Sequence, residues 1–108
     1  MIKNLNMINP LKRDILNSIL SEIDGYKYVD KIIIFGSSTR DDCTKASDID
    51  IAIKWTEDCY DEDGVLKSFT LPVYKIISNQ THGNNDIVCI GYEGQLKNAI
   101  KKGVTVYE

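Results

Sequence analysis

The chain has 108 residues, of which 43% are hydrophobic, and its formal net charge is −3 at pH 7. This length suits one domain over residues 1–108, and the absence of a long apolar run argues against a signal peptide or membrane helix, so we expect a cytoplasmic protein. The acidic balance, with nine of the sixteen acids between residues 41 and 63, argues against a general DNA- or RNA-binding surface.

The first predicted element is an amphipathic helix over residues 10–24. Asn9 is a good N-cap, Pro10 suits the first turn, and apolar residues then recur at helical spacing until Gly25. The apolar run KIIIFG, residues 31–36, predicts a strand that is covered on both faces. The GSS stretch that begins with its last glycine is expected to open a short helical turn.

A second strand is predicted to begin at Asp48. In DIDIAI, residues 48–53, the side chains of Asp48, Asp50 and Ala52 would point to one face and the three isoleucines to the other. Residues 56–64 predict an acidic, solvated loop, and residues 65–81 predict helical material that bends or restarts near Pro72.

The last part of the chain predicts a turn at residues 82–85, a third strand over residues 86–92, a short helix closed by Gly103, and a final strand or extended tail. Strands and helices therefore alternate along the chain. This order predicts an α/β or α+β fold, with a small mixed sheet of about four strands flanked by helices.

Two carboxylates share one face of the second predicted strand. Asp48 and Asp50 would lie roughly 6.6 Å apart, so that both can bind one hard cation between them, and Mg²⁺ is the usual intracellular candidate. Without a cation or full exposure to solvent, their charges would repel each other. Asp86 would supply a third carboxylate if the third strand lies beside the second with its first residue at the same end of the sheet.

A phosphate-binding turn is predicted just before these carboxylates. Gly36, Ser37 and Ser38 follow a strand, where free backbone N–H groups and a hydroxyl favour an anion. Arg40 would lie near the same turn and could neutralise triphosphate charge. A Walker loop is a poorer match because no GK[ST] ending follows the glycine. The two halves together predict a nucleotide–magnesium site for phosphoryl or nucleotidyl transfer.

The stretch FGSSTRDDCTKASDIDIAI, residues 35–53, resembles the GSxxRG…SDxD signature of the polymerase-beta-like nucleotidyltransferases. Residues 32–108 look like the minimal nucleotidyltransferases of that superfamily, which have about this length. The resemblance implies ATP as nucleotide donor and Mg²⁺ as cofactor. Its implied phosphate-binding residues are Gly36, Ser37, Ser38 and Arg40, and its implied catalytic and metal-binding residues are Asp48, Asp50 and Asp86. One departure is Asp41, which replaces the glycine of the signature.

The resemblance also implies a partner. Minimal nucleotidyltransferases are commonly encoded beside a HEPN-domain ribonuclease, and several are antitoxins that transfer AMP to a tyrosine of that toxin. We therefore expect an adenylyltransferase that acts on a HEPN-domain protein within a homo- or hetero-oligomer. Two alternatives stay open: a non-catalytic antitoxin with the same fold, which Asp41 favours, and a small-molecule nucleotidyltransferase such as an antibiotic-modifying enzyme.

Overall fold

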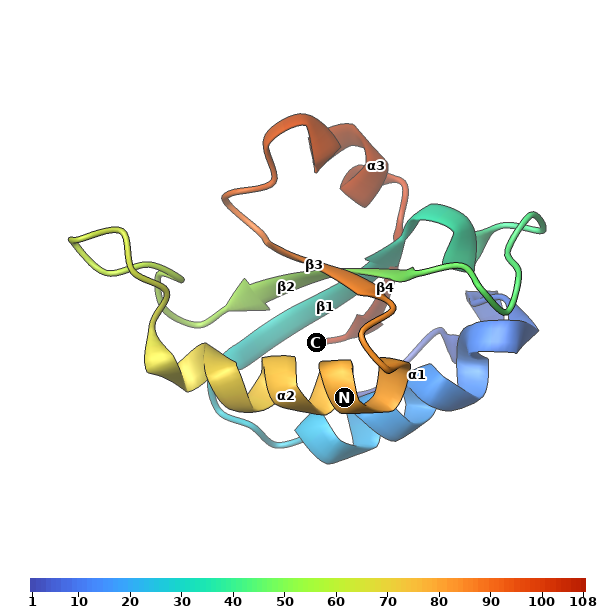
Figure 1. Ribbon diagram of the computed structural model, residues 1–108, viewed down its shortest axis with the longest axis horizontal. Coiled ribbons are helices and arrows are strands. Elements are labelled where there is room, and N and C mark those ends of the chain that lie inside the picture. Colours follow the sequence, from blue (N-terminus) through green and yellow to red (C-terminus); the bar gives the residue numbers. More distant parts are fainter.

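The computed structural model describes residues 1–108, which form a four-stranded mixed sheet with helices on both faces (Figure 1). The strands are β1 (Val29–Phe35), β2 (Ile49–Trp55), β3 (Asn85–Cys89) and β4 (Val104–Tyr107). Their order in the sheet is β3-β2-β1-β4. β1 is antiparallel to both β2 and β4, whereas β2 and β3 are parallel. The predicted fold class, a small mixed sheet flanked by helices, is confirmed.

Two helices cover one face of the sheet. α1 (Pro10–Ile23) and α2 (Leu71–Thr81) lie together below it in Figure 1. Ile49, Ile51 and Ile53 of β2 are almost fully buried in the main core of 19 residues that forms on this side. Because successive side chains on a strand alternate between faces, Asp50 and Lys54 lie on the opposite face. None of the helices combines the length and the apolar content that crossing a membrane requires.

The opposite face of the sheet is only partly covered. α3 (Lys97–Lys101) has five residues and lies above the sheet in Figure 1. Beneath it, a small second core joins Phe35, Ala52 and Ile100. A helix this short leaves part of the strand surface accessible, and this is the surface that carries Asp50.

The two largest differences from the sequence-based expectation are at the start of α2 and at the end of β3. Residues 65–70 form no α-helix and contain only the 3₁₀ turn Ser68–Thr70. A bridge between Tyr60 and Leu66 and backbone N–H groups that donate to the carboxylate of Asp61 close the acidic loop before it. Pro72 then lies in the first turn of α2, where a missing N–H costs nothing. β3 ends at Cys89 instead of continuing to residue 92, because Gly91 turns the chain with a φ of +104°.

Candidate active site

Asp50 and Asp86 lie side by side at the end of the sheet where β2 and β3 begin. They are direct partners in the parallel β2–β3 pair, and Phe35, the last residue of β1, is the partner of Asp50 on its other side. Neighbouring strands are about 4.8 Å apart, so the two carboxylates are immediate neighbours. The prediction for Asp86 required the third strand to lie beside the second and to begin at the same end of the sheet. β3 does both. Asp48 immediately precedes β2 and is exposed.

The negative charges at this end of the sheet act on one another. The pKa of Asp50 is raised from 3.8 to about 6, chiefly because partial burial disfavours its charged form. Asp86 raises this pKa further through its charge and a side-chain hydrogen bond, and Asp48 adds to the effect, while the charge of Arg40 opposes it. These four side chains are thus close enough to share one electrostatic environment. That environment has an excess of negative charge.

The donor atoms at this site fit a hard divalent cation. All three candidate ligands, Asp48, Asp50 and Asp86, are carboxylates, the oxygen ligands that Mg²⁺ prefers. No three His, Cys, Asp or Glu side chains of the chain are already arranged as a metal-binding group. Asp48 and Asp86 are exposed side chains, which can turn toward a cation at little cost. Their metal-binding role stays a prediction.

Gly36 is the residue that lets the turn after β1 approach Asp50. It has a φ of +73°, and a Cβ added there would lie 2.2 Å from Oδ2 of Asp50. Residues Gly36–Thr39 form a single 3₁₀ turn in which the Thr39 hydroxyl donates to the Gly36 carbonyl over 2.8 Å. Only glycine combines this backbone conformation with this close contact.

The two serines of the turn have different surroundings. Ser37 is partly exposed, and its carbonyl accepts a hydrogen bond from the backbone N–H of Arg40 over 2.9 Å. Ser38 is completely buried, and its hydroxyl has no hydrogen-bond partner. A phosphate group can therefore reach Gly36 and Ser37 from solvent, whereas the hydroxyl of Ser38 faces the interior. The predicted phosphate contacts of all three residues stay predictions.

Arg40 is held by an acidic neighbour. Its guanidinium donates to both carboxylate oxygens of Asp42, over 3.0 and 3.4 Å, and this contact lowers the pKa of Asp42. Asp41, which replaces the glycine of the signature, is exposed and makes no ion pair. To bind a phosphate, the guanidinium of Arg40 would have to leave the carboxylate of Asp42.

A cleft of about 530 Å³ separates the turn from α3. Gly36, Thr39 and Arg40 form one wall, and residues from the α3 region form the other. Asn98 and Lys102 are the polar residues of that second wall. Reasoning from the sequence missed both, because nothing in their local pattern links them to the distant Gly36 turn.

Asn9 connects the start of α1 to the same turn. Its side-chain oxygen accepts the backbone N–H of Leu11 over 3.0 Å, which is the predicted cap. In addition, its amide nitrogen donates to the carbonyl of Arg40 over 2.8 Å, and its backbone N–H donates to the carbonyl of Ser38 over 2.8 Å. Asn9 thus braces the turn from outside, a role that its cap pattern alone did not indicate.

Substitution of Asn9 tests this bracing role. Asn9→Ala is expected to lose about 1–2 kcal/mol of unfolding free energy with the cap, and to weaken the binding of ATP, the nucleotide that the sequence resemblance implies. Asn9→Asp keeps an acceptor for Leu11 but cannot donate to Arg40, so it should weaken ATP binding with little loss of stability. Thermal unfolding and titration with ATP measure the two effects. Asn4→Asp is the control, because Asn4 donates to the carbonyl of Thr105; equal ATP affinity in Asn9→Asp and Asn4→Asp would contradict the bracing role.

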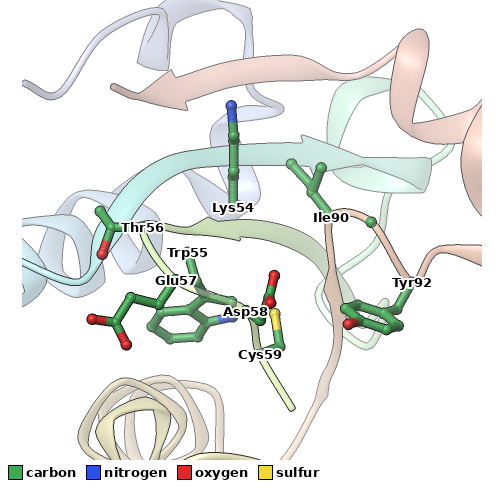
Figure 2. Close-up of a pocket in the computed structure, with 9 residues that line it drawn as sticks. Lys54, Trp55, Thr56, Glu57, Asp58, Cys59, Ile90 and Tyr92 are labelled. Atoms are coloured by element: carbon green, nitrogen blue, oxygen red, sulfur yellow. The ribbon is translucent and has the colours of Figure 1, made fainter. Parts of the chain in front are cut away.

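Another cleft lies at the opposite end of β2 and β3 (Figure 2). It has a volume of about 480 Å³, and it is lined by the last two residues of β2 and by the residues that follow β2 and β3 in the chain. Trp55 packs edge-on against Phe69 and Tyr74 and is 5% exposed, while Tyr60 packs against Tyr92. These contacts favour a packing role for Trp55 and Tyr60 over stacking on a nucleotide base, because the carboxylates are at the other end of the strands.

Comparison with known protein families identifies a family that covers most of the chain. A family model described as Polymerase beta, Nucleotidyltransferase matches residues 17–108. No curated protein matches the chain. The matched range contains all seven predicted site residues, from Gly36 to Asp86.

Proposed function

The chain belongs to the polymerase beta nucleotidyltransferase family, and from this premise we propose that it is a Mg²⁺-dependent adenylyltransferase that moves AMP from ATP to a hydroxyl group of another protein. The acceptor that we propose is a tyrosine of a HEPN-domain toxin, for which this single domain would be the antitoxin. The observation that carries the proposal is the register of Asp50 with Asp86 beside Gly36, where no side chain fits. The protein acceptor is supported by the resemblance of residues 32–108 to the minimal nucleotidyltransferases.

The proposed reaction assigns a role to each group of residues. The backbone of Gly36 and Ser37 binds the phosphates of ATP, with Arg40 as a counter-charge, and Asp48, Asp50 and Asp86 hold Mg²⁺. Bound Mg²⁺ would neutralise phosphate charge and lower the pKa of the acceptor hydroxyl. The hydroxyl oxygen forms a bond to the α-phosphorus, the bond from that phosphorus to the pyrophosphate oxygen breaks, and the carboxylate of Asp86 accepts the hydroxyl proton. The products are the adenylylated protein and pyrophosphate.

One observation favours a second candidate function, a non-catalytic antitoxin that blocks the toxin by binding it. Arg40 forms an ion pair with Asp42, and Asp41, next to Arg40 in the chain, adds a further negative charge. Both features oppose triphosphate binding unless Arg40 changes its partner. In this alternative, protection from the toxin needs no carboxylate.

Labelled ATP separates the two functions. The purified chain is incubated with ATP labelled at the α-phosphate, Mg²⁺ and the HEPN-domain protein encoded next to it. Label is expected on a tyrosine of that protein, located by mass spectrometry, and is expected to disappear with EDTA and in Asp48→Asn. Asp30→Asn, an exposed acid of β1, is the control and should keep full transfer.

The outcomes differ for each candidate. Transfer that persists unchanged in Asp48→Asn contradicts the proposed site. No transfer, together with protection from the toxin that survives Asp48→Asn, identifies the non-catalytic antitoxin.

A further inference from the structure

A basic cleft lies on the same sheet face as Asp50, farther along the strands. It has a volume of about 330 Å³. Ile33, Ile90 and Ile100 form an apolar floor. Figure 2 shows the side chains of Lys54 and Ile90 pointing to the side of β2 opposite Trp55, which is the side of this cleft.

The charge of this cleft is opposite to that of the whole chain. Four lysines and one acid, Glu93, line it. The net charge of its lining is therefore +3, whereas the net charge of the chain is −3. Both carboxylate oxygens of Glu93 accept a hydrogen bond from the backbone N–H of Gly91, at 2.9 and 2.8 Å, so this carboxylate already has a partner within the chain. The lysines come from three elements: Lys31 of β1, Lys54 of β2, and Lys97 and Lys101 of α3.

The lysines of α3 are the least compensated. Lys31 and Lys54 each lie 3.5 Å from an acid outside the cleft, Glu108 and Asp30 respectively. Lys97 and Lys101 form no ion pair. Converging like charges repel one another, so a ligand with negative charge would be stabilised between them.

We propose that this lysine-rimmed cleft docks an acidic segment of the acceptor protein, with Asp or Glu on either side of an apolar side chain. This inference rests on the proposed function for the identity of the partner. The apolar floor suits an aliphatic or aromatic side chain, and the rim suits carboxylates. No arginine lines the cleft. Arginine is the residue best suited to bind phosphate, because its guanidinium can donate two parallel hydrogen bonds. Carboxylates beside an apolar anchor therefore match the cleft better than a free phosphate does.

The position of the cleft adds a prediction about the partner's sequence. Asp50 and Lys54 share a face of β2 and are four residues apart, which corresponds to about 13 Å along a strand. An extended peptide covers this distance in about four residues. The acidic segment is therefore expected about four residues from the hydroxyl that receives the nucleotide.

A model peptide tests the docking without any chemistry. The probe is a fluorescein-labelled nonapeptide of alternating glutamate and leucine, and its anisotropy is followed with the full chain in the absence of nucleotide and metal. Lys97→Gln with Lys101→Gln is expected to weaken binding at least fivefold. The control is Lys45→Gln with Lys75→Gln, two exposed lysines outside the cleft with the same total charge change, and it should weaken binding less than twofold. Thermal unfolding checks that both double variants are folded.

Two further measurements decide between occupants. A peptide with serine in place of leucine should bind at least threefold more weakly; equal binding would mean that charge alone is recognised and would overturn the proposal. Equal weakening in the two double variants would overturn it as well. Inorganic tripolyphosphate should displace the peptide poorly, and tripolyphosphate binding that is stronger than peptide binding and lost in Lys97→Gln/Lys101→Gln would identify a free-anion site instead.

The transfer reaction links the cleft to the acceptor. In Lys97→Gln/Lys101→Gln, the KM for the acceptor protein is expected to rise at least fivefold, while the KM for ATP is unchanged. An unchanged KM for the acceptor would overturn the role in acceptor docking. If the peptide binds as expected but no protein is ever labelled, the proposed function fails and the acidic-peptide site stands, so the two failures are distinguishable.

Discussion

Replacing Asp50 by asparagine is expected to abolish nucleotidyl transfer and, at the same time, to make the metal-free protein more stable. The loss of the proposed metal ligand is expected to remove several kcal/mol of transition-state stabilisation, which corresponds to at least ~10³-fold in kcat. Burial and the charges of Asp86 and Asp48 together raise the pKa of Asp50, so its ionised form is unfavourable in the folded protein. Replacing it by a neutral side chain removes this cost, which is the reason for the gain in stability. Activity and stability are therefore expected to change in opposite directions.

The pH dependence of this stability has a definite sign. Because the pKa of Asp50 is about 6 in the folded protein against 3.8 for the free side chain, the folded state binds the proton more tightly than the unfolded state. The free energy of unfolding therefore falls as the pH rises from about 4 to about 6, and the whole penalty is present above that range. Without screening it would be about 3 kcal/mol; because Asp50 is partly solvated, we expect about 1–2 kcal/mol.

Thermal unfolding in EDTA measures this effect. At pH 8, Asp50→Asn is expected to unfold about 5–10 °C above the unmodified protein, and the difference should shrink to about a third of this at pH 4.5. Asp30→Asn is again the control, with little change at either pH. A variant that is not more stable at pH 8, or whose advantage is independent of pH, would show that Asp50 carries no such penalty. Adding Mg²⁺ should raise the unfolding temperature of the unmodified protein and leave Asp50→Asn unchanged.

Gly36→Ala is expected to destabilise the protein by about 3 kcal/mol or more and to abolish transfer. About 1–2 kcal/mol comes from the left-handed backbone conformation that alanine disfavours. The rest comes from the clash of the new methyl group with Asp50, since a Cβ at residue 36 would lie 2.2 Å from its Oδ2. The clash displaces a carboxylate that the proposed reaction needs, so kcat should fall together with stability.

Two variants separate the conformational cost from the clash. Gly64 has nearly the same φ, +76°, and nothing within 4 Å of an added Cβ, so Gly64→Ala reports the backbone cost alone. Gly36→Ala should also cost less in an Asp50→Ala background, because the clashing carboxylate is then absent. Urea unfolding of the single and double variants gives the coupling energy. Equal costs for Gly36→Ala and Gly64→Ala would contradict a close approach of residue 36 to Asp50.

Local sequence patterns determined where most helices and strands form and which of their side chains are buried. The period of two in DIDIAI predicted that the isoleucines are buried on one face and that the aspartates lie on the other. The structure confirms this for the isoleucines and for Asp50, whereas Asp48 lies just before β2. The order of helices and strands, and the turn that begins at Gly36, also followed from short-range patterns. Each of these properties depends on residues a few positions apart, where backbone geometry alone fixes which side chains share a face.

Only the tertiary structure decided which distant segments meet. Asp86 lies beside Asp50 because β3 pairs in parallel with β2 in the order β3-β2-β1-β4, an arrangement that no local pattern encodes. The second role of Asn9 and the lysine-rimmed cleft likewise join residues from separate elements. The physical reason is that strand order is set by burying every apolar face of the domain at once, a property of the whole chain. The carboxylates could therefore be recognised one by one, whereas their meeting point required the fold.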